Sequence, residues 1–147
     1  MADTSIQKIV ETWVRDHFLA KKYGCQFAER HLSLSWGGKF KFDAVSEDGQ
    51  IVANISSSPG KTNKGRSASG KIHKIKSDTL YLTNAIGPTT RVQVFTEKSM
   101  AEHFTKEAKN GRYPGDVVLL TVELPASIQE QVTKVRKIAV DEVTPLT

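Results

Sequence analysis

The residues whose spacing could support chemistry lie on two segments joined by Asp48-Gly49. This dipeptide is typical of a two-residue type I′ hairpin turn. Counting outward from such a turn predicts three cross-strand pairs on one face: Val45–Val52, Asp43–Asn54 and Lys41–Ser56. The other face would carry Phe42, Ala53 and Ile55. Asp43 is therefore a candidate acid among polar neighbours, although a lone strand aspartate often serves only as a local structural partner.

A second candidate feature is a basic segment. The chain from Gly49 through Ser77 has no acidic residue and carries six basic ones: Lys61, Lys64, Arg66, Lys71, Lys74 and Lys76. Such side chains neutralise phosphates with little sequence preference, and loop glycines let the backbone approach a partner closely. Contact with nucleic acid or another polyanion is one interpretation. A solvated loop leading into an ordinary helix face is the other.

Three other patterns do not support a site. Gly60-Lys61-Thr62 follows a predicted strand, but the first glycine of a phosphate-binding P-loop would fall on Ile55. The four histidines have no metal-ligand spacing, so we expect structural or surface roles for them. Cys25 is the single cysteine, cannot form an internal disulfide, and is expected to be inert.

Hydrophobic periodicity predicts the elements that must position these residues. Helices are expected over residues 4–22, 68–84 and 127–143, with another following residue 96. Strands are expected over residues 31–35, 39–45, 51–56, 91–95 and 117–122. The order α-β-β-β-α-β-α-β-α predicts an α/β fold with a mixed central sheet flanked by helices, because a three-strand meander precedes a β-helix-β crossover.

Composition limits the class of protein. The 147 residues include 21 Lys and Arg against 16 Asp and Glu, which gives a net charge of +5. A hydrophobic content of 38% and a charged content of 25% are ordinary for a globular chain, so we expect one domain over residues 1–147. No long apolar run opens the sequence, so neither a signal peptide nor a membrane partner is expected, and the predicted location is cytoplasmic.

The element order and the string FDAVSEDGQIVANIS at residues 42–56 resemble the PD-(D/E)XK nuclease superfamily, which has the restriction-endonuclease-like fold. The resemblance covers a core of about residues 5–120 and leaves the helix at about 127–143 as an addition. In that family, an Asp of the second strand and a (D/E)-x-K motif of the third bind a divalent metal and assist an attacking water. Asp43 matches the Asp, Asn54 falls at the acid and Ser56 at the lysine.

The resemblance implies two alternatives for catalysis. In an active protein, Asp43 would bind Mg²⁺ or Mn²⁺ together with Asn54 or Glu29. Lys41, opposite Ser56, would polarise the attacking water. Glu11 is a further source of a second carboxylate. In an inactive protein, the site is degenerate because Asn54 brings no negative charge and Ser56 no cation.

The expected function is therefore nucleic-acid binding, with metal-dependent phosphodiester hydrolysis if the site is active. Duplex DNA is the expected partner, because aromatic residues are few and the basic loop contains none for stacking. The residues expected to hold backbone phosphates are Lys61, Lys64, Arg66, Lys71 and Lys74. The alternative is a non-enzymatic module for protein interaction or homodimer assembly, through the apolar stripe that includes Val132 and Val135.

Overall fold

The computed structural model describes residues 4–62 and 64–143. Within them, the elements follow the predicted order: α1 (Thr4–Trp13), a π-helical turn (Val14–Leu19), α2 (Ala20–Tyr23), β1 (Phe27–Ser33), β2 (Lys39–Ser46), β3 (Ile51–Ser56), α3 (Ser69–Thr83), β4 (Thr90–Phe95), α4 (Lys98–Lys109), β5 (Val117–Thr121) and α5 (Ala126–Val143). The predicted strand at residues 31–35 begins earlier, at Phe27, because Phe27 pairs with Ser46 of β2. No helix of these residues is long and apolar enough to cross a membrane.

The five strands form one mixed sheet in the order β1-β2-β3-β4-β5. The first three strands are antiparallel neighbours, and β3, β4 and β5 are parallel to one another. Parallel neighbours need a crossover connection, and the helices α3 and α4 supply the two crossovers. The predicted α/β architecture with a mixed sheet flanked by helices is confirmed.

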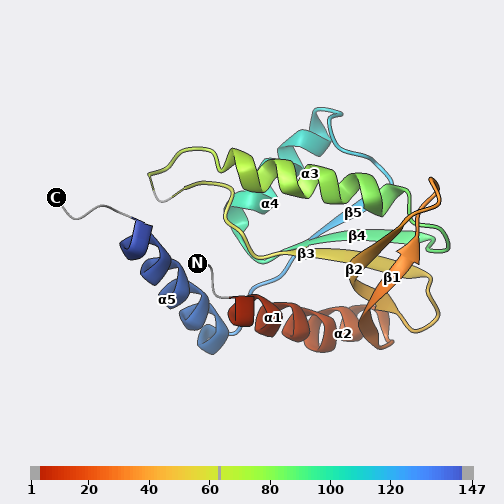
Figure 1. Ribbon diagram of the computed structural model, residues 1–147, viewed down its shortest axis with the longest axis horizontal. Helices are drawn as coiled ribbons and strands as arrows, with labels where there is room; N and C mark the ends of the chain where they lie inside the picture. The colour runs from red at the N-terminus through yellow and green to blue at the C-terminus, as the bar shows by residue number, and fades with distance from the viewer. Residues whose placement is uncertain (1–3, 63, 144–147) are drawn as a thin grey trace.

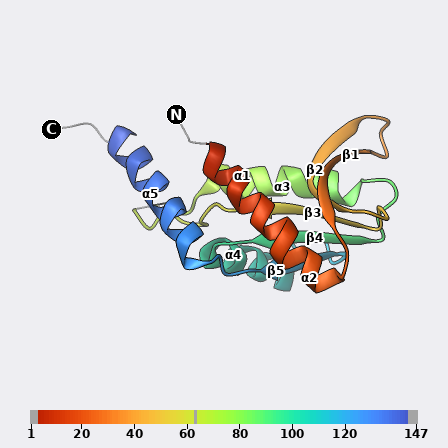
Figure 2. The same ribbon diagram turned by 90° about the horizontal axis from the view of Figure 1, so that it is seen from below.

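Helices cover both faces of the sheet, with α3 and α4 on one face and α1 and α2 on the other (Figures 1 and 2). The face under α3 and α4 buries a cluster that includes Phe42, Leu82 and Phe104. The opposite face buries a second cluster that includes Val14 of the π-helical turn and Val92 of β4. Because strand side chains alternate, each central strand contributes to both clusters.

The last helix, α5, packs against the chain's own first helix. Val132 is buried and belongs to the same cluster as Val10 of α1, and Ile128 packs against that cluster. Part of the predicted apolar stripe of α5, Ile128 and Val132, therefore covers an intramolecular surface. Arg136 ties the helix further to the body of the molecule, because its guanidinium donates to the Glu97 carboxylate and the Ser57 carbonyl.

The turn between β2 and β3 differs from the predicted type. Asp48 does not have a positive φ, as a type I′ turn would require, and only Gly49 is left-handed, with φ of 75°. The loop spans four residues, and the Gly49 N–H donates to the Ser46 carbonyl at 2.9 Å. A four-residue loop leaves the same register as a two-residue loop, so Val45 still pairs with Val52 as predicted.

The predicted faces of the β2 side chains are wrong for the residues that precede Ala44. The β1–β2 pairing shifts by one residue, since Ala28 pairs with Val45 whereas Arg30 pairs with Phe42. This β-bulge puts Phe42 in the same buried cluster as Val45, away from Ala53 and Ile55. The β2–β3 ladder consists of two pairs, the second being Ala44–Ala53, so the predicted Asp43–Asn54 and Lys41–Ser56 ladder pairs do not form.

A close backbone contact anchors the loop that follows β3. The Gly60 N–H donates to Ser99 Oγ at 2.8 Å, and a Cβ at Gly60 would lie 2.7 Å from the Ser99 carbonyl oxygen. We expect Gly60→Ala to lower the free energy of unfolding by about 1–3 kcal/mol, because backbone must move to admit the methyl group. Chemical denaturation measures this change.

Gly70→Ala is the matched control, because a Cβ at Gly70 meets no atom within 4 Å and the residue lies in α3. It is expected to raise the free energy of unfolding by about 0.5 kcal/mol through the lower entropy of the unfolded chain. Equal stability of Gly60→Ala and the wild type would contradict the close contact.

Candidate functional site

Asp43 lies at the bulge, where β2 separates from β3. Its Oδ2 accepts a hydrogen bond from the backbone N–H of Ile55 at 2.8 Å, so the carboxylate takes the place of a ladder partner. Its carbonyl oxygen accepts a hydrogen bond from Arg15 Nη1 at 2.9 Å. Arg15 belongs to the π-helical turn, an irregularity often found at functional sites. Asp43 is thus a local structural partner, and it is also held in a fixed position.

Burial raises the pKa of the Asp43 carboxyl group. The hydrogen bond from Ile55 and the charge of Lys74 oppose this rise, whereas the nearby carboxylates of Asp78 and Glu29 add to it. Burial likewise raises the pKa of Glu11, and the charge of Asp43 is the next cause. Asp43 therefore lies near carboxylates of both α1 and α3, although the whole chain is basic.

Asn54 and Ser56 lie on the face of β3 that α3 covers. Asn54 is 4% exposed, and its Nδ2 donates to the carbonyl oxygen of Asp78 at 3.4 Å. Ser56 Oγ accepts a hydrogen bond from the Ser58 N–H at 3.4 Å. Gln93 of β4 stands beside Asn54 in the parallel register and is 1% exposed. These polar side chains are buried where the core would otherwise be apolar.

A small polar cavity of about 120 Å³, called the inner chamber, separates these strand residues from α3. Asn54, Ser56 and Gln93 line it from the sheet, and Lys74 and Asp78 line it from the helix. Lys74 Nζ and Asp78 Oδ2 form an ion pair at 2.9 Å. In the part of the chain that the structure describes, Gln93 Oε1 is buried without a hydrogen-bond partner. The inner chamber thus contains the carboxylate of Asp78, the ammonium group of Lys74 and an amide oxygen of Gln93 that has no hydrogen-bond partner among the described residues.

Asp78 was not among the residues predicted from the sequence, and Lys74 was expected only to hold phosphates. A signal for Asp78 was present, because it is the first acidic residue after the acid-free stretch that begins at Gly49. It also stands four residues after Lys74, the spacing that places two side chains on one side of a helix. An acid and a cation, the charges that the expected motif would have at Asn54 and Ser56, are therefore present on α3 as Asp78 and Lys74.

Lys41 and Glu29 lie elsewhere than predicted. Their side chains form an exposed ion pair at 3.6 Å between β2 and β1. Because the bulge turns Phe42 toward α3, strand alternation turns Lys41 toward the opposite face, whereas Ser56 lines the inner chamber. Lys41 therefore does not fill the vacant lysine position. Glu29 contributes only the weakest named influence on the pKa of Asp43.

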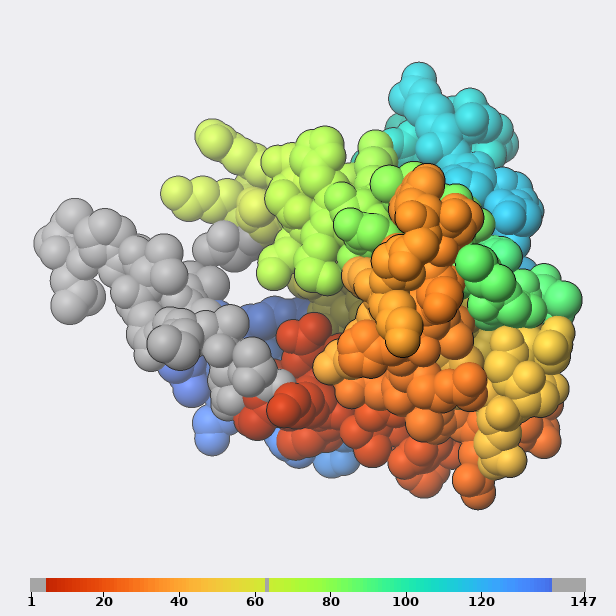
Figure 3. All heavy atoms as spheres, turned by 45° about the vertical axis from the view of Figure 1, so that its right-hand side comes forward, coloured from red at the N-terminus to blue at the C-terminus, as the bar shows by residue number. Residues whose placement is uncertain are grey.

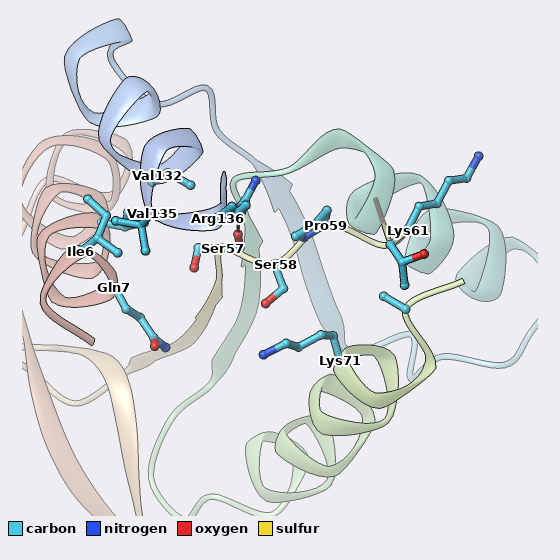
Figure 4. Close-up of a pocket in the computed structure, with 13 residues that line it drawn as sticks. Ile6, Gln7, Ser57, Ser58, Pro59, Lys61, Lys71, Val132, Val135 and Arg136 are labelled. Atoms are coloured by element: carbon cyan, nitrogen blue, oxygen red, sulfur yellow. Dashed lines mark hydrogen bonds between the residues drawn. The ribbon is translucent and has the colours of Figure 1, made fainter. Parts of the chain in front are cut away.

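The inner chamber adjoins a larger cavity of about 570 Å³, called the outer chamber (Figure 4). Its apolar wall comes from α1 and α5 and consists of Ile6, Val10, Val132 and Val135. The two chambers share four lining residues: Gln7, Ser57, Ser58 and Lys71. In Figure 4, the side chain of Lys71 extends from α3 toward Ser58, whereas that of Lys61 points away from the chamber.

The basic segment forms an exposed surface beside the outer chamber. Lys61, Lys64 and Arg66 are exposed on the loop after β3, and Lys71 is exposed on the first turns of α3. None of these four side chains forms an ion pair with the residues described here. Figure 3 shows side chains of this yellow-green region projecting from the molecule. Lys74 is partly neutralised by Asp78, and Lys76 pairs with Glu107 at 3.4 Å.

The oxygen atoms near the inner chamber are of the chemical types that bind a hard divalent cation. Carboxylates of Asp43 and Asp78 and amide oxygens of Asn54 and Gln93 are the ligands that Mg²⁺ prefers. No group of three His, Cys, Asp or Glu side chains converges in residues 4–62 and 64–143. A magnesium ion would therefore complete its shell with waters and phosphate oxygens, as it commonly does.

Comparisons with protein-family models, curated proteins and solved structures give no match to this chain.

Proposed function

We propose that the protein binds nucleic acid through the basic surface formed by Lys61, Lys64, Arg66, Lys71 and Lys74. The observation that carries this proposal is the position, beside two connected chambers, of four basic side chains that form no ion pair with residues 4–62 and 64–143. A run of cations without acidic neighbours creates a positive potential that attracts phosphates. Lys71 links the surface to the chambers, because it lines both of them.

The sheet and helices support a restriction-endonuclease-like core as the scaffold of this function. Three antiparallel strands precede a β-helix-β crossover, and Asp43 of the second strand contacts the backbone of the third. Lys74 and Asp78 from α3 stand where Ser56 and Asn54 lack charge. This arrangement favours metal-dependent phosphodiester hydrolysis as a second function, in which Asp43 and Asp78 would hold the cation and Lys74 would stabilise negative charge on the phosphate.

The proposal of nucleic-acid binding is tested by a salt series with labelled duplex DNA. For Lys71→Glu/Lys74→Glu, we expect a loss of affinity of about tenfold or more, and a slope of log affinity against log salt reduced by about two. The matched control is Lys106→Glu/Lys109→Glu, which makes the same charge change at the same spacing on exposed residues of α4. Equal losses for both double variants would show a general charge effect and contradict an interface at α3.

A further inference from the structure

We propose that the two chambers hold one unpaired nucleotide of the bound strand, with the base in the outer chamber and its phosphate at Lys71. This inference rests on the proposed nucleic-acid binding and specifies the form of the substrate. It replaces the expectation of intact duplex DNA with a strand end or a single-stranded segment.

The size and lining of the outer chamber support this assignment. Its volume of about 570 Å³ lies in the usual range of about 300–1,000 Å³ for small-molecule pockets. Residues of α1, of α5, of the loop after β3 and of the start of α3 line it, and a volume of this size suits one nucleotide rather than a stacked base pair. The half-buried wall residues Ile6 and Val135 are aliphatic, and they would contact a base without aromatic stacking.

The polar groups between the chambers define the remainder of the ligand. Lys71 Nζ supplies a cation, and Ser57 and Ser58 supply hydroxyl groups at the boundary where a phosphate would lie (Figure 4). These groups together suit an anion that is attached to an apolar body.

The continuity of the outer chamber with the basic surface favours a nucleotide over a fatty acid. Lys61 and Lys71 belong to the basic surface and also line the outer chamber. A strand whose phosphates lie along this surface can therefore place one phosphate at Lys71 and the attached base in the outer chamber.

The test compares a short single strand with a blunt duplex of the same sequence. We expect the single strand to bind more tightly, and Val135→Phe to weaken its binding by about tenfold while duplex affinity changes by less than about twofold. Thr133→Phe is the control, because it adds the same side chain at an exposed position of α5. Ile6→Phe fills the chamber from α1, and thermal melting confirms that each variant is folded.

The outcomes separate the two proposals. In one outcome, the duplex binds as tightly as the single strand, in a salt-dependent way, with no selective effect of Val135→Phe or Ile6→Phe. This result would overturn the proposal of a nucleotide in the chamber and leave the proposal of a nucleic-acid interface intact. Failure of both strand forms to bind overturns both proposals. Displacement of the single strand by laurate but not by deoxyadenosine monophosphate would identify an acyl pocket and overturn the nucleotide assignment.

Discussion

Asp43→Asn is expected to raise the free energy of unfolding at pH 7. The asparagine Oδ1 can still accept the hydrogen bond from Ile55, while the cost of burying a charge near Asp78 and Glu29 is removed. Asp43→Ala is expected to be less stable than Asp43→Asn by about 1–3 kcal/mol, because the Ile55 N–H then loses its acceptor. Urea denaturation of the two variants and the wild type measures the difference.

The pH dependence of stability provides a second readout of the same residue. The pKa of Asp43 is raised in the folded protein, so between the ordinary carboxyl pKa and the raised one the folded state binds more protons than the unfolded state. The stability of the wild type should therefore fall as pH rises through this window, and the fall is complete above the raised pKa. Asp43→Asn should reduce this slope, leaving the contribution of Glu11.

An Asp43→Asn protein that is less stable than the wild type at pH 7 would contradict this account of Asp43. A carboxylate that lowers stability in its charged form is commonly retained for its chemistry, and active sites often contain such groups. If the site is catalytic, Asp43→Ala should abolish cleavage and spare nucleic-acid binding. Equal cleavage by Asp43→Ala would remove Asp43 from the catalytic assignment.

Asp78→Asn is expected to reduce Mg²⁺- or Mn²⁺-dependent cleavage of a labelled oligonucleotide by about a hundredfold or more. The substitution keeps the size of the side chain but removes the carboxylate that faces the inner chamber and pairs with Lys74. Addition of the metal should also raise the melting temperature of the wild type more than that of the variant, because a cation that binds the folded state stabilises it.

Glu102→Gln is the control for this substitution, since it makes the same kind of charge change at an exposed position of α4. Cleavage by Asp78→Asn at the rate of the wild type would show that Asp78 is not part of the site. If the wild type cleaves neither strand form with either metal, the hydrolysis proposal falls and the binding proposal stands.

The order of elements could be predicted because each one carries its own periodic pattern. The predicted pairing of Val45 with Val52 is also correct, because a four-residue loop and a two-residue loop place the same residues opposite each other. The bulge could not be predicted, because the extra residue of β2 depends on its pairing with β1. That single residue reversed the expected face of Phe42 and, with it, that of Lys41.

The site was predicted incompletely for a similar reason. Asn54 and Ser56 could be placed on one face from the alternation of β3, whereas the predicted pairing of Asp43 with Asn54 does not form. Asp78 and Lys74 reach the same region only through the packing of α3 on the sheet, which depends on a cluster of residues distant in sequence, including Leu82 and Phe42. Gln93 comes from a strand in parallel pairing, whose register no short turn determines.

The hydrogen bond between Ile55 and Asp43 makes one backbone amide a spectroscopic reporter of a side-chain charge. The Ile55 N–H points at the Asp43 carboxylate at 2.8 Å, so its proton resonance should move as that carboxyl group titrates. Neighbouring amides of β3 donate within the sheet and should move less. Following the Ile55 amide proton resonance during addition of Mg²⁺ or of an oligonucleotide would show directly whether either ligand changes the charge near the point where β2 and β3 separate.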